Sequence, residues 1–277
     1  MKLVRLSAGA AAVLAASLLT AQGVQAADHS TRSQLRDATP CPNKLISAHE
    51  GFRKNYDGDT IDSQNAAFRI GANIADTDVW VTADSYQVEI HDADVSHSTD
   101  GTGLITDMTI DQWSLLRTTQ HHEPIPTLEE TLALPQLQQP GRFVMIETKY
   151  SYQKPGRIEA LVAAIQAAGV QTHVIIYSDY LSQVQKVNAL DPSIITWAKP
   201  LDYAPPPSDV PGVDGIMLPA SLLTADITAQ YHAIGYTVIR QRTAESLTNW
   251  QAFLATGADG LMTDSPQLMI KRCRELG

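Results

Sequence analysis

Three carboxylates occur near the ends of short apolar runs in this sequence. Asp76 and Asp78 lie two residues apart, so both project to the same side of a strand, and Glu147 ends a later run of the same kind. Three carboxylates brought close together would repel one another unless a cation lay among them, and all-oxygen ligation suits Ca²⁺ or Mg²⁺ rather than zinc. The spacing therefore predicts a divalent metal site with Asp76, Asp78 and Glu147 as ligands.

Two histidines, His49 and His91, also follow apolar segments, and Lys149 stands two residues after Glu147. An unperturbed imidazole titrates near neutrality, so two of them on opposite sides of a substrate could act as base and acid. A divalent ion between them could polarise a phosphoryl oxygen and orient an attacking hydroxyl. Taken together, these residue types indicate chemistry on a phosphate ester.

Eight strands that alternate with helices are expected to position these residues. The strand candidates are Lys44–His49, Ala72–Thr82, Arg142–Lys149, His173–Tyr177, Ile194–Ala198, Asp214–Leu218, Tyr236–Arg240 and Asp259–Thr263. Apolar residues at three- and four-residue spacing indicate helices at Arg157–Ala168, Leu181–Leu190, Ala225–Ile234, Leu247–Thr256 and Pro266–Leu276. The alternation predicts an α/β fold, a single (β/α)8 TIM barrel, whose active residues lie at the C-terminal ends of the strands.

The segment 83–140 is too long for a simple crossover, and it contains a candidate hairpin strand, Tyr86–Ile90, and a turn at Gly101 and Gly103. We therefore expect an insertion after strand two, lying over the C-terminal mouth of the barrel. No Gly-x-Gly-x-x-Gly motif follows a strand, which argues against a dinucleotide-binding fold. Residues 44–277 are predicted to form one domain.

The first 26 residues are typical of an export signal. Lys2 and Arg5 precede the apolar stretch Ser7–Thr20, and Val24-Gln25-Ala26 offers small residues for cleavage. The stretch is too short and too rich in alanine for a membrane span, and no cysteine follows it, so we expect no stable membrane anchor. Residues 27–43 are then a flexible lead-in, and the mature protein is expected to be secreted, either extracellular or periplasmic.

Charge and cysteine content limit the partners and the compartment. The chain has 30 acidic and 20 basic residues, a formal net charge of −10, which argues against nucleic acid or an anionic membrane surface as a standing partner. Cys41 and Cys273 lie near the two ends of the mature chain, which meet at the bottom face of a closed barrel. An even count in an oxidising compartment favours a disulfide between them, with two free thiols as the alternative.

Several motifs resemble those of the glycerophosphodiester phosphodiesterase family. The segment Gly71–Val79, continuing to Ile90-His91-Asp92, is similar to that family's Gly-Ala-Asp-x-x-Glu-x-Asp-Val…His-Asp pattern. Further similarities follow in order at Asp100–Gly103, Pro126–Glu130, Ile146–Lys149 and Gly257–Pro266. The resemblance runs from about residue 44 to residue 270, and it implies a (β/α)8 barrel that depends on a divalent metal.

The resemblance also implies roles for single residues. His49 and His91 become the catalytic pair, Lys149 a phosphate contact, and Asp76, Asp78 and Glu147 the metal ligands. Asp76 stands where the family usually has Glu.

Two departures concern the segment after His49. The family's His-Arg-Gly is His49-Glu50-Gly51 here, which reverses a charge expected near the phosphate. Glu50 could contact the substrate or the metal, or point outward, and Lys149, Arg53 or Lys54 could restore the positive charge. The family's Glu-Asn-Thr has no clean counterpart, and the nearby candidates are Asp57, Asp59 and Asp62.

These observations lead us to expect an enzyme that hydrolyses a small glycerophosphodiester, or a lysolipid, to glycerol phosphate and an alcohol. A second hypothesis is a phospholipase D-like enzyme similar to the spider sphingomyelinases, which share Gly71-Ala72-Asn73. Those enzymes bear a disulfide-rich loop beside the second histidine, and no cysteine lies near His91. A third hypothesis, motivated by Glu50, is a secreted phosphodiester-binding protein that has lost turnover.

Overall fold

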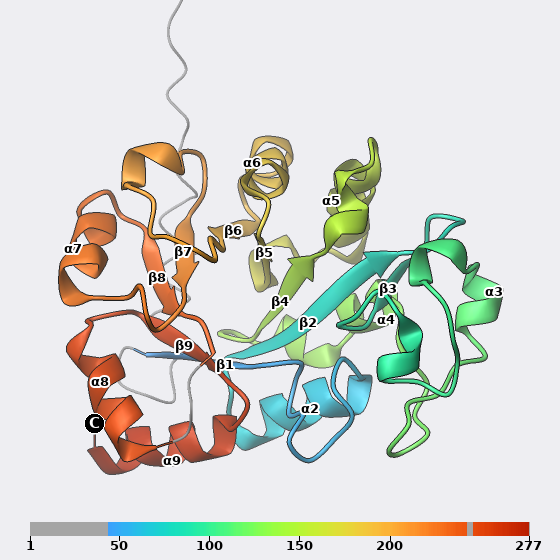
Figure 1. Cartoon of the computed structure of the whole chain (residues 1–277), viewed down its shortest axis with the longest axis horizontal. Helices are drawn as coiled ribbons and strands as arrows, with labels where there is room; N and C mark the ends of the chain where they lie inside the picture. Colours follow the sequence, from blue (N-terminus) through green and yellow to red (C-terminus); the bar gives the residue numbers. More distant parts are fainter. Residues whose placement is uncertain (1–43, 243–245, 277) are drawn as a thin grey trace, which may run out of the picture.

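In the computed structural model, which describes residues 44–242 and 246–276, eight parallel strands close into a barrel (Figure 1). The barrel strands are β1 (Leu45–Ala48), β2 (Ile74–Val81), β4 (Phe143–Thr148), β5 (Val174–Ser178), β6 (Ile195–Ala198), β7 (Gly215–Leu218), β8 (Thr237–Arg240) and β9 (Gly260–Thr263). They pair in sequence order, and β1 closes the ring by pairing with both β9 and β2. The predicted (β/α)8 fold is confirmed.

The barrel strands are almost wholly buried because apolar layers cover both of their faces, as is usual for parallel sheets. One apolar cluster fills the interior of the barrel: Leu45, Ile74, Phe143, Met145, Ile175, Tyr177, Ile195, Trp197, Met217, Ile239 and Met262. A larger cluster packs the outer faces of the strands against the helices. The interior is therefore a packed core rather than a pore, and polar side chains above it must face the mouth.

Helices surround the strands (Figure 1). The principal ones are α2 (Ile61–Ile70), α5 (Arg157–Ala168), α6 (Leu181–Leu190), α7 (Ala225–Ala233), α8 (Leu247–Ala255) and α9 (Pro266–Leu276). The last five lie within a residue of the predicted helices, whereas α2 was missing from the prediction. Its ends carry clear signals, since Thr60 and Ser63 form a capping box and Gly71 ends the helix at φ 104°.

The insertion after β2 packs on one side of the barrel mouth (Figure 1). It begins with β3 (Gln87–Glu89), which pairs antiparallel with β2 and confirms the expected hairpin strand. The rest consists of short helices: η1 (Val95–His97), η2 (Ile105–Asp107), α3 (Ile110–Trp113), α4 (Leu128–Leu132) and η3 (Pro135–Gln138). A small core of its own, which includes Val95, Ile105 and Trp113, holds the insertion together.

Some predictions concern residues outside the described range. The export signal (1–26), the lead-in (27–43) and Cys41 all lie there, so processing and the Cys41–Cys273 disulfide stay predictions. Cys273 itself is 2% exposed on α9, a helix that packs against β1. Within the part of the chain that the structure describes, no helix is both long and apolar enough to span a membrane.

Gly260 is expected to be required where β9 meets β1 and β8. A β-carbon at this position would lie 2.6 Å from Leu45 Cβ, 2.7 Å from Leu45 O and 3.0 Å from Ile239 Cδ1. Gly260→Ala should therefore lower the free energy of unfolding by about 1–3 kcal/mol, because backbone atoms cannot move aside cheaply. Urea denaturation followed by circular dichroism would measure the loss.

The matched control is Gly169→Asn at the end of α5. Gly169 has φ 68°, which asparagine tolerates, and a β-carbon there would meet nothing within 4 Å. This variant should change the free energy of unfolding by less than about 1 kcal/mol. Equal stability of the Gly260→Ala variant and the wild type would contradict the packing argument.

Candidate active site

The alternation of side chains along two strands places the acidic residues at the barrel mouth. On β2 the side chain of Ile74 points into the interior core, so Asp76 and Asp78 follow it on the same side, one and two steps nearer the C-terminal end. On β4 the interior residue Met145 is followed in the same way by Glu147. The three carboxylates therefore stand above the apolar interior, at the end of the barrel where the strands finish.

Two lysines lie among these carboxylates. Lys149 Nζ is 2.8 Å from Asp78 Oδ1 and 3.2 Å from Glu147 Oε1, so two of the predicted metal ligands share one ammonium. Lys199, directly after β6, places its Nζ 2.7 Å from the same Glu147 oxygen and 3.0 Å from Asp179 Oδ1. Burial alone would raise the pKa of Glu147, but the two lysines outweigh it and lower that pKa to about 2.

Asp76 is held by hydrogen bonds rather than by an ion pair. The Tyr177 hydroxyl donates to Asp76 Oδ1 at 2.8 Å, and the backbone N–H of Glu50 donates to Asp76 Oδ2 at 3.2 Å. Burial and the neighbouring charge of Asp78 raise the pKa of Asp76 to about 7, although the charge of His49 and the hydrogen bond from Tyr177 oppose the shift. Asp76 therefore fixes the start of the loop after β1 as well as contributing a carboxylate.

The loop after β1 turns sharply and brings two more carboxyl groups to the cluster. Glu50 has φ 49° and Gly51 has φ 72°, so the chain reverses immediately after His49. Asp59, also left-handed at φ 55° and 2% exposed, accepts the backbone N–H of Asp78 at 3.1 Å. Burial, then the charges of Asp78 and Glu50, raise the pKa of Asp59 well above its usual range.

The two other acidic candidates of this loop have different partners. Asp57 accepts hydrogen bonds from Thr118 Oγ1 at 2.5 Å and from the backbone of His121 at 3.0 Å, which ties the loop to the insertion. Asp62 is exposed in the first turn of α2. Of the three candidates for the missing family motif, the structure thus brings Asp59 to the acidic cluster.

The donor set fits a divalent cation. Asp78 Oδ2 is buried and accepts no hydrogen bond from any described residue, which is costly for a carboxylate unless a positive ligand approaches it. Glu50, Asp78 and His91 each offer one ligand atom, and these atoms lie within 4.8 Å of one another. The two carboxylates of this group, Glu50 and Asp78, are oxygen donors that suit Ca²⁺ or Mg²⁺, and His91 would add a nitrogen. This group shares only Asp78 with the predicted trio, while Glu147 is joined to Asp78 through Lys149.

His49 is almost buried at the end of β1, with a side chain 10% exposed. Its Nδ1 lies 2.6 Å from Asp264 Oδ1, just after β9, and its Nε2 lies 3.7 Å from Glu50 Oε1. Burial would lower the pKa of His49, but the hydrogen bond to Asp264 and the charge of Asp76 raise it overall. The imidazole is therefore oriented by one carboxylate and faces the acidic cluster with its other nitrogen.

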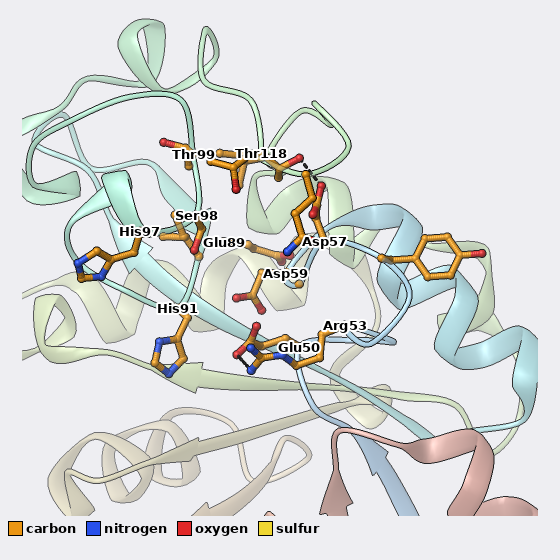
Figure 2. A pocket seen from close by; sticks show the side chains of 16 residues that line it. Glu50, Arg53, Asp57, Asp59, Glu89, His91, His97, Ser98, Thr99 and Thr118 are labelled. Carbon is orange, nitrogen blue, oxygen red and sulfur yellow. Dashed lines mark hydrogen bonds and ion pairs between the residues drawn. The ribbon is translucent and has the colours of Figure 1, made fainter.

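His91 faces the same cluster from the insertion, just beyond β3 (Figure 2). Its side chain is 49% exposed, and its Nδ1 lies 3.1 Å from Asp92 Oδ1. The other oxygen of Asp92 lies 3.1 Å from Nδ1 of His97, so the two histidines share one carboxylate. The structure thus brings one buried and one exposed imidazole close to Glu50: His49 Nε2 lies 3.7 Å from Glu50 Oε1, and a ring nitrogen of His91 lies within 4.8 Å of a Glu50 carboxylate oxygen.

A cavity of about 200 Å³ lies between the β1 loop and the insertion (Figure 2). Glu50, Arg53 and Asp59 line it on the side of the β1 loop, and His91 lines it from the insertion. The insertion contributes Ser98, Thr99, Thr118, Thr119 and Gln120. The cavity is therefore polar, opens beside the acidic cluster, and depends on both the barrel and the insertion for its walls.

Comparisons with known proteins agree with this arrangement. Residues 49–155, which contain both histidines and all the carboxylates predicted as ligands, match the model of the glycerophosphoryl diester phosphodiesterase family. A glycerophosphodiester phosphodiesterase from Bacillus altitudinis is 28% identical over 250 residues, covering 83% of this chain and 98% of that protein. The chain is therefore similar to proteins of this family over most of its length, and residues 49–155 match the family model itself. The predicted family resemblance is therefore confirmed.

Solved structures with this phosphodiesterase fold are also similar. A glycerophosphoryl diester phosphodiesterase from Silicibacter pomeroyi superposes with a TM-score of 0.77 at 18% identity, covering 90% of this chain and 98% of that one. A phosphodiesterase from Oleispira antarctica, solved with its product sn-glycerol-3-phosphate, gives 0.67 at 23% identity, covering 83% of this chain and 96% of that one. At these identities the likeness supports the barrel fold.

All the site residues predicted from the sequence within the described range meet at the barrel mouth. They are His49, Glu50, Asp76, Asp78, His91, Glu147 and Lys149, and their catalytic, metal-binding and substrate-binding roles stay predictions. Sequence reasoning missed Lys199 and Asp264, although each directly follows a predicted strand. The rule that barrel sites use strand ends would have found both.

Asp264→Asn is expected to lower the pKa of His49, because it removes the hydrogen-bonded charge that raises that pKa. The pKa of Asp264 is lowered from 3.8 to about 2, chiefly by His49. The variant should therefore lose most unfolding free energy between about pH 4 and the raised pKa of His49. The difference from wild type should vanish as the pH falls towards 2 and Asp264 is protonated, and it should shrink as the pH rises through the pKa of His49. NMR titration of His49 and denaturation at several pH values would measure both effects.

Asp92→Asn provides the control, because Asp92 contacts His91 and His97 rather than His49. It should leave the titration of His49 unchanged. An unaltered His49 pKa in the Asp264→Asn variant would show that Asp264 does not govern this imidazole.

Proposed function

We propose that this protein hydrolyses glycerophosphodiesters to glycerol phosphate and an alcohol. The observation that carries the proposal is that both His49 and His91 lie close to Glu50, which lines a polar cavity together with His91. The match of residues 49–155 to the phosphodiesterase family model and the product bound by the Oleispira antarctica relative support the same substrate class.

His49 would act as the general base. Because Asp264 accepts a hydrogen bond at Nδ1, the proton of the neutral ring stays on Nδ1 and Nε2 keeps a free lone pair on the side of Glu50. That nitrogen would take the proton of the glycerol 2-hydroxyl, whose oxygen attacks phosphorus and forms a cyclic phosphate. The bond from phosphorus to the other alcohol breaks in the same step.

His91 would supply the proton that the leaving alcohol needs. Its half-exposed ring lines the cavity, where an alcohol can depart to solvent. In the second step water opens the cyclic phosphate with the two roles reversed, which returns each histidine to its starting protonation state. Both imidazoles therefore have to reach the same phosphate.

A divalent cation, Ca²⁺ or Mg²⁺, completes this proposal. Asp78, with its unpartnered oxygen, would hold it together with Asp76, Glu147 and Glu50. Such an ion would neutralise the carboxylates and polarise a phosphoryl oxygen. Lys149, now bound to Asp78 and Glu147, would then be able to donate to a phosphate oxygen.

The export pattern in residues 1–26 supports the further proposal that the mature protein acts outside the cytoplasm. Glu50, which motivated the hypothesis of a binding protein without turnover, has Arg53 as an ion-pair partner at 2.6 Å. The charge reversal at position 50 is thus locally compensated, which favours a functional enzyme.

Purified protein should turn over glycerophosphocholine, and removal of divalent cations with a chelator should lower the rate by about a hundredfold or more. Addition of Ca²⁺ or Mg²⁺ should restore it, since hard cations suit the oxygen donors of the site. Release of glycerol phosphate would be measured with a coupled assay. Parallel assays on glycerophosphoethanolamine and lysophosphatidylcholine would define the substrate class.

A chelator saturated beforehand with Ca²⁺ is the control and should have no effect. Full turnover in excess free chelator would remove the metal from the proposal. Turnover of lysolipids alone would favour the phospholipase D-like hypothesis instead.

His49→Ala and His91→Ala should each lower kcat by about 10²–10⁴-fold, the usual contribution of a positioned acid or base. His122→Asn, at an exposed loop position with φ 56°, is the matched control and should keep the wild-type rate. Circular dichroism would verify that each variant is folded. Wild-type kcat in either alanine variant would exclude that histidine from the reaction.

A further inference from the structure

The active cavity is lined mainly by negative and neutral groups. Glu50, Asp57, Asp59 and Glu89 all contribute to its walls, whereas Arg53 is the one lysine or arginine among the described residues that line it. A phosphodiester carries a negative charge, so a cavity of this composition would repel it unless a cation were placed inside. Arg53 is therefore the lining side chain whose positive charge could attract a phosphate ligand.

The lysines nearby are already committed to carboxylates. Lys149 has two carboxylate partners, and Lys199 has two as well. Both side chains are close to fully buried, at 12% and 8% exposure, and neither lines the cavity. Their charges balance the acidic cluster, and Lys149 would become available to a phosphate oxygen only where a bound divalent ion took its place between Asp78 and Glu147. Arg53 is the lysine or arginine that lines the cavity without this condition.

Arg53 differs from these lysines in geometry. Its Nη1 lies 2.6 Å from Glu50 Oε1 (Figure 2). The same nitrogen lies 3.4 Å from His49 Nδ1, which places the guanidinium beside the proposed base. Its side chain is 36% exposed, and its Nε and Nη2 donate to no atom of the described residues. A guanidinium held at one nitrogen still offers a planar pair of donors, which matches two phosphate oxygens.

We propose that Arg53 is the phosphate-binding cation of the active cavity, and that Glu50 holds its guanidinium in place beside His49. This inference rests on the proposed function, because it assigns the phosphate of the substrate to the cavity beside the two histidines. Glu50 then serves as an anchor for Arg53, and the charge reversal at position 50 is balanced three residues later. The ligand class is a phosphomonoester or phosphodiester of a small polyol.

The test compares Arg53→Ala and Arg53→Lys with wild type, with Mg²⁺ at one fixed concentration throughout. Two quantities are measured: the Kd for sn-glycerol 3-phosphate by calorimetry, and kcat and KM for glycerophosphocholine. Loss of a charge-assisted bidentate contact should raise the Kd and KM of Arg53→Ala by about ten- to a hundredfold. The Kd and KM of Arg53→Lys should lie between those of wild type and Arg53→Ala, since lysine keeps the charge but loses the planar pair of donors.

Lys54→Ala is the matched control. It removes one positive charge from the neighbouring position, but Lys54 is exposed, contacts Ser265 Oγ at 3.1 Å and does not line the cavity. Its Kd and KM should stay within about twofold of wild type. A rise in Kd and KM equal to that of Arg53→Ala would mean that net charge, rather than a contact, governs phosphate binding, and would overturn the proposal.

A second variant separates the loss of the phosphate contact from the exposure of an unpaired buried acid. Glu50→Gln combined with Arg53→Met removes both charges, so no carboxylate is left without its partner. The Kd of this double variant should still rise by about tenfold or more. A Kd within about threefold of wild type in both Arg53→Ala and the double variant would overturn the proposal.

The two proposals fail in different ways. If wild type binds sn-glycerol 3-phosphate through Arg53 but hydrolyses no glycerophosphodiester, the proposed function is wrong and the assignment of Arg53 stands. If wild type hydrolyses glycerophosphocholine with the same KM in every Arg53 variant, the function stands and the assignment is wrong. Failure of wild type to bind sn-glycerol 3-phosphate would overturn the assignment as well.

Discussion

Buried negative charge is the constraint on which the mouth of this barrel depends. Asp76, Asp78 and Glu147 are nearly inaccessible at the top of an apolar interior, where a lone carboxylate is far less stable than in water. Lys149 and Lys199 offset part of this cost for Asp78 and Glu147. Asp76 has no lysine partner of this kind, and burial and the charge of Asp78 raise its pKa to about 7. A positive ligand at the mouth would therefore stabilise the ionised carboxylates.

The same constraint explains why the surrounding loops are so heavily hydrogen-bonded. Asp76 accepts the backbone N–H of Glu50, and Asp59 accepts that of Asp78, so the acidic groups themselves fix the turns that carry their neighbours. Left-handed backbone at Glu50 and Asp59 persists because these contacts over-determine it. Local strain near the site is thus compensated by the charge network that the site requires.

The barrel could be predicted from the sequence because its signals are local. Short buried strands and periodic helices repeat along the chain, and the alternation at Asp76 and Asp78 sets the direction of both side chains. The pairing of Arg53 with Glu50 could not be predicted, because it depends on a tight turn at positive φ. Likewise α2 was not predicted, because its polar sequence has few apolar residues at helical spacing, although Thr60 and Gly71 mark its ends.

The two imidazoles of the site belong to parts of the fold that differ in how strongly the barrel constrains them. His49 ends a central barrel strand, where any shift would disturb β9 and the core beneath it. His91 follows β3 in the insertion, which has a small core of its own beside the barrel. A change in the length of the insertion could therefore alter the distance between the two rings, and so admit bulkier alcohols. The barrel strands beneath would not need to change.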